Sequence, residues 1–189
     1  MLKRSQKYGR DNDLRQMFSS IARRYDTTNR WITWGQDLRW RRELLDKVRL
    51  PHGGMLLDVG AGTGDLSLEA KARDKNTLVV GIDLTPAMLL MGRQKEGGEL
   101  VRWVNGDALD LPYPCGVFDA VVSGYLLRNV LDVERALIEQ YRVLKNGGQV
   151  VCLDTTPPAC DAWHQPVRLY LRYVLPFIGG MVAGDAEAY

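Results

Sequence analysis

The sequence predicts an α/β protein with a doubly wound, mainly parallel sheet. Apolar runs of strand length alternate with segments of helix length, a glycine turn follows the first run, and carboxylates follow the ends of several runs. Continuous apolar runs are typical of strands buried on both faces, and parallel neighbours need a crossover between them. Helices must then cover both faces of the sheet.

Two helices are expected before the sheet. Apolar side chains recur at helical spacing over residues 13–26, and a more basic helix is expected over residues 36–48. Residues 1–50 hold 13 Lys and Arg against 6 Asp and Glu, whereas residues 51–189 hold 12 against 17. We therefore expect a basic helical extension over 1–50 and an acidic domain over 51–189. The basic charge suits an anionic membrane or a nucleic acid, and a solvated helix face is the equally weighted alternative.

The later elements are expected at strand Met55–Val59, helix Asp65–Arg73, strand Leu78–Asp83, helix 87–93, strands 100–104 and 118–123, helix 133–144, strand 149–154 and helix 167–175. Thr85 and Pro86 suit the N-cap and first position of helix 87–93. The run Asn146-Gly147-Gly148 is a stop signal that would end helix 133–144.

Carboxylates lie at or just past the ends of four predicted strands: Asp58, Asp83, Asp107 and Asp154. The carboxyl ends of parallel strands share one edge of a sheet, where open α/β sheets bind their ligands. The sequence therefore predicts a binding site at this edge.

A GxGxG turn of Gly60, Gly62 and Gly64 follows the first strand. Glycine allows a ligand to approach the backbone closely and allows positive φ. A dinucleotide fingerprint requires a third glycine where this chain has Asp65, whose charge would oppose a pyrophosphate. Asp58, before the turn, adds an acid that suits an ammonium group.

S-adenosylmethionine matches this charge pattern, because it carries an amino group and a sulfonium but no phosphate. Asp83 ends the next strand, 19 residues after Gly64, and can accept both ribose hydroxyls. The glycines alone are weak evidence, since an ordinary glycine turn is the alternative. Together with Asp58, Asp83 and Asp107 they predict S-adenosylmethionine as cofactor and S-adenosylhomocysteine as its product.

The chain resembles class I methyltransferases, and more closely the ubiquinone/menaquinone biosynthesis C-methyltransferase family. The resemblance covers nearly the whole chain and is carried by residues 17–26 with Asn29, 57–65, 81–89, 105–108, 127–130, 141–148 and 184–189. It implies a Rossmann-like fold and a residue set for the cofactor: Asp58, Gly60, Gly62, Thr63, Gly64, Asp83, Leu84, Asp107, Ala108 and Gly124. Within that set Thr63 would lie at the methionine end, Asp83 at the ribose, and Asp107 and Ala108 at the adenine.

Two departures from the family pattern concern the acceptor side. The family usually has Phe-Gly ahead of Leu-Arg-Asn, where this chain has Tyr125-Leu126. Some members have a cofactor-contacting serine where this chain has Gly124, and here Ser123 stands one position earlier. An altered acceptor site is therefore expected.

The resemblance implies methyl transfer to a ring carbon of a polyprenyl quinol, such as demethylmenaquinol or a ubiquinone precursor. Arg128 would stabilise the phenolate or position a water, with a surface salt bridge as the alternative. Asn129 would hydrogen-bond a quinol oxygen. Tyr25 would close the lid formed by residues 1–50 or simply pack in the core, and Asp154 is either a general base or a strand-end turn residue.

Other function classes are less favoured. Nucleic-acid amino-methyltransferases resemble one another in a Pro-Pro-aromatic run after the fourth strand, where this chain has Ser123-Gly124-Tyr125-Leu126. The fourth strand ends without a carboxylate for a catechol-type metal site, and three cysteines with two histidines form no zinc pattern. Another small aromatic or lipid-like acceptor, or a non-catalytic S-adenosylmethionine-binding protein, remains an alternative.

The expected location is the cytoplasm, with peripheral contact at the inner face of the membrane. The N-terminus lacks the apolar stretch of a signal peptide, and no run reaches the ~20 residues that span a bilayer. A complete class I sheet ends in a hairpin for which residues 176–189 offer no strands, so the domain is expected to be C-terminally incomplete. Its fifth strand would then be an exposed edge that favours a homodimer.

Overall fold

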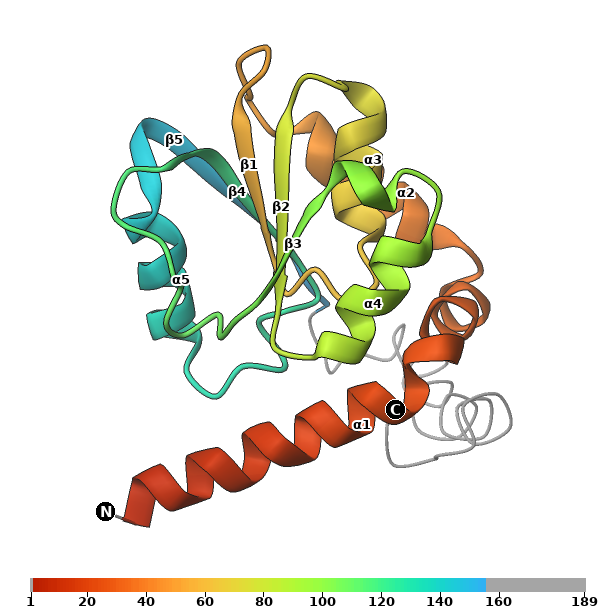
Figure 1. The fold of residues 1–189 in the computed structure, drawn as a ribbon, viewed down its shortest axis with the longest axis vertical. Coiled ribbons are helices and arrows are strands. Elements are labelled where there is room, and N and C mark those ends of the chain that lie inside the picture. Colours follow the sequence, from red (N-terminus) through yellow and green to blue (C-terminus); the bar gives the residue numbers. More distant parts are fainter. Residues whose placement is uncertain (1, 156–189) are drawn as a thin grey trace, which may run out of the picture.

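The computed structural model describes residues 2–155, with side chains from residue 16 onward. These residues form a parallel sheet with helices on both faces and a long helix across one end (Figure 1). The elements are α1 (Leu2–Thr33), α2 (Gln36–Asp46), β1 (Met55–Val59), α3 (Asp65–Arg73), β2 (Leu78–Asp83), α4 (Pro86–Gln94), η1 (Gly98–Leu100), β3 (Arg102–Asn105), β4 (Phe118–Gly124), α5 (Val133–Arg142) and β5 (Leu144–Leu153).

The five described strands lie in the order β3-β2-β1-β4-β5, and every neighbouring pair is parallel. The chain builds outward from β1 to β3 and then returns to place β4 on the other side of β1. This reversal creates a crevice between the carboxyl ends of β1 and β4. Open α/β sheets bind ligands at such a topological switch point.

The core lies on both sides of the sheet, because successive side chains of a buried strand point to opposite faces. Leu56 packs with Leu44 and Leu66, which come from α2 and α3. Its neighbour Leu57 packs with Phe118 and Val143 on the other face, next to α5. Both leucines of β1 are almost fully buried, which explains why the strand reads as one apolar run.

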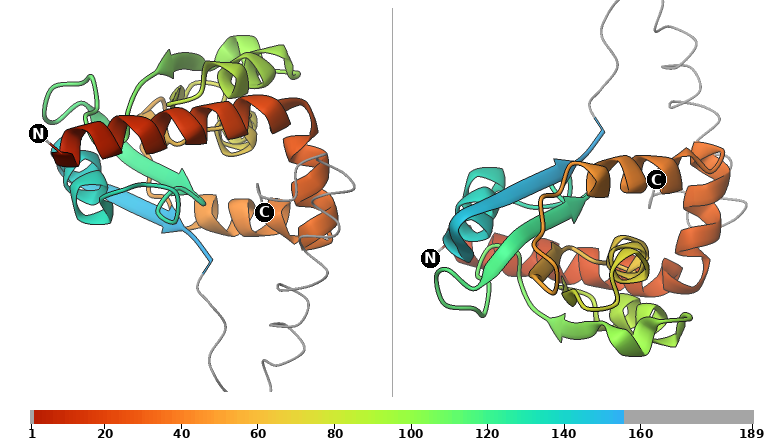
Figure 2. Two further views of the ribbon diagram at one scale, coloured as in Figure 1. Left: turned by 90° about the horizontal axis from the view of Figure 1, so that it is seen from below. Right: turned by 90° about the horizontal axis from the view of Figure 1, so that it is seen from above.

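Helix α1 runs beneath the carboxyl ends of the strands and turns at its end into α2 (Figures 1 and 2). Ile21 and Ala22 of α1 pack against Met88 of α4 in a small separate apolar cluster. Phe18 and Tyr25, on the same stripe of the helix, pack edge to face with ring centroids 6.0 Å apart. The N-terminal helices thus cover the edge where the site was predicted.

The doubly wound α/β architecture is confirmed, and so are β1, α3 and β2 at the predicted bounds. Several expected boundaries were wrong. The first helix is much longer than residues 13–26, the second helix ends at Asp46 rather than at residue 48, and the third strand begins at Arg102 rather than at residue 100. Leu100 belongs to the turn η1, where its N–H donates to the carbonyl of Gly97, so it is unavailable to the sheet.

The glycine run before the fifth strand was also misread. We expected Asn146-Gly147-Gly148 to end a helix over 133–144, but the helix ends at Arg142 and the three residues lie inside β5. The pairing of β4 and β5 shifts between Phe118 and Ala120, and Gly147 has φ of 81°. A β-bulge that needs positive φ uses the same residues as a helix stop, so local sequence could not separate the two.

Two expectations lie outside the described residues: the aromatic helix over 167–175 and the missing C-terminal hairpin. Within the described sheet, β5 is an edge strand, and dimer formation through it stays a prediction. None of the helices over residues 2–155 combines the length and apolar character required to cross a membrane.

Candidate functional site

A cavity opens at the switch point between β1 and β4 and contains about 830 Å³ of space that is partly open to solvent. One half of its lining follows β1, β2 and β3: Gly60, Gly62, Ile82, Asp83, Leu84, Thr85, Met88, Gly106, Asp107, Ala108 and Leu109. The other half follows β4 and includes α1: Gly124, Tyr125, Leu126, Asn129, Val130, Leu131, Phe18 and Tyr25.

The glycine turn lines the first half with bare backbone. Gly60 and Gly62 have φ of 72° and 55°, a region that other residues rarely adopt. A Cβ on Gly62 would meet no atom within 4 Å, so this position faces open space. A Cβ on Gly60 would lie 2.7 Å from Cδ1 of Leu126, so Gly60 lets the segment after β4 approach the turn.

Gly64 is a glycine for a different reason, since it does not line the cavity. A Cβ there would lie 2.1 Å from the ring of Trp103, and one on Gly92 would lie 2.6 Å from the same ring. The indole donates to the carbonyl of Gly98 over 2.7 Å. Gly64 therefore makes room for a tryptophan of β3, a role that sequence spacing does not reveal.

Asp83 ends β2 inside the cavity and organises its polar wall. One carboxylate oxygen accepts from the N–H of Gly62 and the other from the N–H of Thr85, each over 2.8 Å. Burial raises the pKa of Asp83, and these two hydrogen bonds oppose that rise. Each oxygen keeps a further lone pair, so the carboxylate can still accept hydroxyl donors from a ligand.

The segment after β3 provides the next part of this wall. Asp107 and Ala108 line the cavity, and one oxygen of Asp107 accepts from the N–H of Leu109 over 2.8 Å. Leu84 lines the cavity between Asp83 and Thr85. The structure therefore brings the predicted ribose and adenine residues together around one cavity.

Asp58 lies behind the glycine turn rather than in the cavity lining. Its carboxylate is almost fully buried and accepts from the hydroxyl of Ser67 over 2.6 Å. Burial raises its pKa to about 7, although Ser67 and the charge of Arg41 oppose the rise. In this conformation the Asp58 carboxylate joins β1 to Ser67 of α3, the helix that follows the turn.

Asp65 is neutralised by two cations. Its oxygens pair with Lys95 over 2.6 Å and with Arg30 over 2.7 Å. Burial alone would raise the pKa of Asp65, but these partners hold it below its ordinary value. We expected Asp65 to be an unpaired charge that repels a pyrophosphate, but its charge is compensated by Lys95 and Arg30. Only the missing third glycine of the dinucleotide motif still disfavours a dinucleotide.

The same ion-pair network ties α1 to the glycine turn. Lys95 also pairs with Asp26 of α1 over 2.6 Å, and the hydroxyl of Thr63 donates to Asp26 over 2.5 Å. Arg30 continues the network to Asp37 of α2. Thr63 is buried and does not line the cavity in this conformation. These bonds therefore tie α1 and α2 to the glycine turn on one side of the cavity.

Tyr25 and Asn129, expected at the acceptor, line the second half together with Gly124, which was expected at the cofactor. Two other candidates, Arg128 and Asp154, lie outside the lining. The side chain of Arg128 donates to the hydroxyl of Thr155 over 3.0 Å and is 47% exposed. Asp154 accepts from the backbone N–H of Arg128 over 3.2 Å. In this conformation both residues brace the segment after β4 from outside the cavity.

Sequence reasoning missed several lining residues, notably Phe18, Tyr125 and Leu126. Phe18 was assigned only to an apolar helix stripe, and Tyr125-Leu126 was noted only as a departure from the family pattern. Within residues 16–155, no group of three His, Cys, Asp or Glu side chains is arranged to hold a metal ion.

The chain matches the model of the ubiE/COQ5 methyltransferase family over residues 5–189. It is 46% identical to a demethylmenaquinone methyltransferase of Thermus thermophilus, over 92% of this chain and 80% of that protein. It is 44% identical to the ubiquinone/menaquinone biosynthesis C-methyltransferase UbiE of Desulfotalea psychrophila, over 92% of this chain and 71% of that protein.

Two solved structures share the fold. Geranyl diphosphate C-methyltransferase of Streptomyces coelicolor, solved with S-adenosylhomocysteine, is 26% identical with a TM-score of 0.55, over 60% of this chain and 42% of that one. The [4+2]-cyclase SpnF is 32% identical with a TM-score of 0.53, over 57% of this chain and 41% of that one. Proteins that share this fold therefore catalyse more than one type of reaction, and the fold alone does not identify the reaction. With the family match over nearly its whole length, this chain belongs to the ubiE/COQ5 methyltransferase family.

Proposed function

We propose that this S-adenosylmethionine-dependent methyltransferase transfers a methyl group to a ring carbon of a polyprenyl quinol such as demethylmenaquinol. The observation that carries the proposal is the division of the cavity. The glycine turn and Asp83 line one part of the cavity, and the large side chains of Tyr125, Leu126 and Leu131 after β4 line another. The names of the relatives, demethylmenaquinone methyltransferase and UbiE, support a quinone-type acceptor.

The residues of the first half fit the cofactor. Gly62 leaves open space where a side chain would stand, and the carboxylate of Asp83 has lone pairs left for a ribose diol. Asp107 and Ala108 would hold the adenine, with Leu84 beside them. Thr63 lies next to this turn, where exchange of its bond with Asp26 would free its hydroxyl for the methionine end. When bound, S-adenosylmethionine supplies an electrophilic methyl group.

The second half would hold the quinol ring. A methyl acceptor carbon must be electron-rich, and a ring becomes so when its hydroxyl loses a proton to give a phenolate. Asn129 lines this half, and its amide donates to the carbonyl of Tyr125 over 3.0 Å, which leaves one amide proton for a quinol oxygen. Tyr25 and Phe18 of α1 would close over the ring and exclude water.

Arg128 and Asp154 are proposed to act at the rim of this half. Arg128 offers a fixed positive charge that favours the phenolate, and it would reach the ring by exchanging its bond with Thr155. Asp154, which accepts from the backbone N–H of Arg128, is the candidate to take the proton of the acceptor hydroxyl. Both roles require a movement of the segment that follows β4.

We also propose that the N-terminal extension binds the membrane surface where quinones reside. Trp31 and Trp34, at the corner between α1 and α2, are 67% and 86% exposed. Tryptophan is favoured at membrane interfaces, and residues 1–50 carry the excess of basic charge. Binding to anionic vesicles should weaken in the double variant Trp31→Ser/Trp34→Ser. The exposed Tyr141 of α5 provides the control Tyr141→Ser, and binding insensitive to salt, anionic lipid and the tryptophans would contradict the proposal.

The function is tested with S-adenosylmethionine labelled at its methyl group. We expect a single turnover to place the label on a ring carbon of a short-chain demethylmenaquinol, located by mass spectrometry and NMR, and to leave RNA unlabelled. If only another small aromatic or lipid-like compound became labelled, that compound would take the place of demethylmenaquinol as the proposed acceptor. Binding of S-adenosylhomocysteine without any transfer would favour the alternative of a non-catalytic cofactor-binding protein.

A further inference from the structure

Tyr125 has an unusual backbone conformation at the end of β4. Its φ is 60°, in a region that a bulky residue rarely adopts. Two hydrogen bonds hold it there: its N–H donates to the carbonyl of Leu153 over 2.7 Å, and its carbonyl accepts from the Asn129 amide over 3.0 Å. Strained residues of this kind gather at functional sites, where the surrounding structure keeps them in place.

Two guanidinium groups lie close to the ring of Tyr125. The Arg41 carbon Cζ is 5.2 Å from the ring centroid and that of Arg128 is 5.0 Å away. Arg41 is buried and paired with Asp37 over 2.5 Å, so its position is fixed. Two cations near a phenol draw electron density from its ring and strengthen its hydroxyl as a donor.

The hydroxyl of Tyr125 is buried and has no hydrogen-bond partner within the part of the chain that the structure describes. The residue is only 7% exposed and lines the cavity. Burial raises the pKa of Tyr125 despite Arg41 and Arg128, so the hydroxyl stays protonated at neutral pH. An unpaired buried hydroxyl lowers stability unless a ligand completes it.

We infer that the Tyr125 side chain, whose hydroxyl is covered in this structure, turns when the acceptor enters the cavity and donates a hydrogen bond to an oxygen on the acceptor's aromatic ring. The bond would orient the ring and favour ligands that carry a carbonyl or phenolate oxygen over plain aromatic hydrocarbons. This inference rests on the proposed function, because it assigns the second half of the cavity to an oxygen-bearing ring.

The first test uses two small ligands that differ by one oxygen. 1-Tetralone is a bicyclic aromatic ketone that accepts but cannot donate a hydrogen bond, and tetralin is its counterpart without oxygen. In Tyr125→Phe, with S-adenosylhomocysteine present, the affinity for 1-tetralone should fall about fivefold to tenfold by ligand-observed NMR titration. The affinity for tetralin should stay the same. Equal 1-tetralone affinity in both proteins, or no binding of 1-tetralone by the wild type, would overturn the inference.

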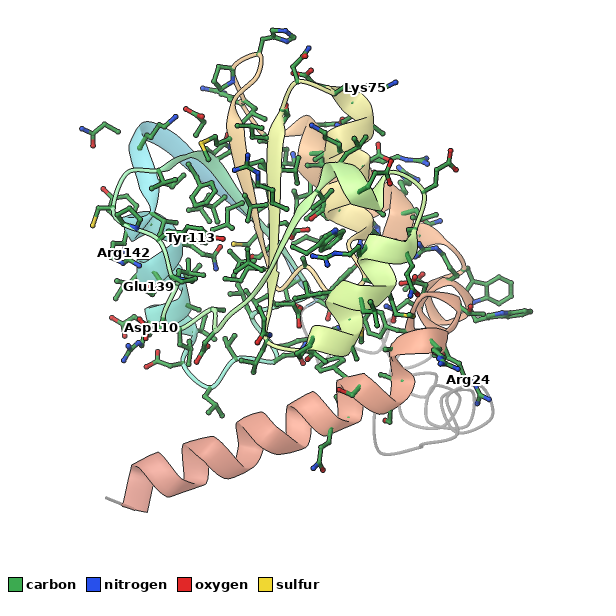
Figure 3. The ribbon with its side chains drawn as sticks, in the orientation of Figure 1. Arg24, Lys75, Asp110, Tyr113, Glu139 and Arg142 are labelled. Carbon is green, nitrogen blue, oxygen red and sulfur yellow. The ribbon has the colours of Figure 1, made fainter. Side chains whose placement is uncertain are left out.

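Tyr113→Phe is the matched control. The Tyr113 hydroxyl is also buried without a partner in the described residues, but Tyr113 does not line the cavity. It packs against Phe118 and lies near Glu139 and Arg142, beside α5 (Figure 3). Its change to phenylalanine should leave the affinities for both ligands unaltered. Both phenylalanine variants should be at least as stable as the wild type in thermal unfolding, because each removes an unpaired buried hydroxyl.

Kinetics separate this inference from the proposed function. With demethylmenaquinol, Tyr125→Phe should raise KM about tenfold and change kcat much less, since the bond forms to the bound ring as well as in the transition state. Quinol methylation with unchanged KM and unchanged 1-tetralone affinity would defeat the inference alone. The expected 1-tetralone result without methylation of any quinol would defeat the proposed function alone.

Discussion

The two halves of the cavity differ in how far backbone and large side chains contribute to their lining. The half proposed for the cofactor presents bare backbone at Gly60 and Gly62, and its Asp83 accepts hydrogen bonds from two backbone N–H groups. The acceptor half consists of large side chains, and one of them, Tyr125, keeps a hydroxyl without a partner in residues 16–155. Main chain preorganises a site for one invariant ligand, whereas side chains can be exchanged to suit a particular acceptor.

The largest effect is expected within the glycine turn, where two similar residues should respond differently. Gly64→Ala should lower the free energy of unfolding by about 3–5 kcal/mol, because it adds left-handed strain to a clash with Trp103. Gly62→Ala should cost only the strain, about 1–2 kcal/mol, because its Cβ would meet no atom within 4 Å. Urea unfolding measures both values.

The functional consequences of the two changes should run in the opposite order. Gly62→Ala should abolish measurable binding of S-adenosylhomocysteine in calorimetry, because its methyl group would occupy ligand space. In Gly64→Ala, the added change Trp103→Leu should recover part of the lost stability. If both alanine variants lose the same stability, the division of this turn into a ligand glycine and a packing glycine is wrong.

The next test concerns the polar wall. Asp83→Asn should weaken S-adenosylhomocysteine binding about 100-fold, because charge-assisted hydrogen bonds to a diol are worth about 1.5–3 kcal/mol each. The control Asp110→Asn changes an exposed carboxylate (Figure 3) that follows the lining residue Leu109 in the chain and is not itself in the lining, so it should have little effect. Calorimetry gives both affinities. A loss of 1-tetralone affinity as large as that of the cofactor would mean that the two halves are not separate.

A pH effect should originate beneath the cofactor half. The pKa of Asp58 rises from 3.8 to about 7 on folding, so between these values the native state binds more protons than the unfolded state. The stability of the wild type therefore falls as pH rises between these two pKa values and stops falling above about pH 7. From pH 5 to pH 8 the wild type should lose about 3 kcal/mol relative to Asp58→Asn, which does not titrate.

Urea unfolding of both proteins at several pH values measures this difference. Arg41 and Asp83 also act on Asp58, and both are present in each protein, so the comparison isolates the Asp58 carboxyl. A constant difference between the two proteins from pH 5 to pH 8 would show that Asp58 is already ionised in the folded state.

The smallest effect is expected at the ion pairs that tie α1 to the glycine turn. Lys95→Ala breaks the ion pairs with Asp26 and Asp65 and should cost about 1 kcal/mol, because both are partly exposed. Hydrogen exchange should increase in α1 while the sheet remains protected. Arg39→Ala removes a fully peripheral pair with Glu43 and should cost less than about 0.5 kcal/mol. If Lys95→Ala and Arg39→Ala lowered the free energy of unfolding by the same amount, the ion pairs of Lys95 would not be what keeps α1 packed against the glycine turn.

The predictable elements share a strong local signal. β1, α3 and β2 were placed at their observed bounds because two apolar runs of strand length, and a helix that directly follows a glycine turn, can each be recognised from a few neighbouring residues. The start of β5 was misplaced because Gly147 serves a bulge whose need arises from pairing with β4. Trp103 and Tyr125 were missed because their importance depends on partners remote in the sequence.

The sequence by itself determined the doubly wound order of elements, the glycine turn and the acids that follow the strands, because all of these are local patterns along the chain. Only the tertiary structure decided which acids face the cavity. Asp83 and Asp107 line it, Asp58 is bonded to Ser67 of α3, and Asp65 is paired with Lys95 and Arg30. The physical reason is that the charge, burial and partners of a side chain depend on the residues that folding brings beside it.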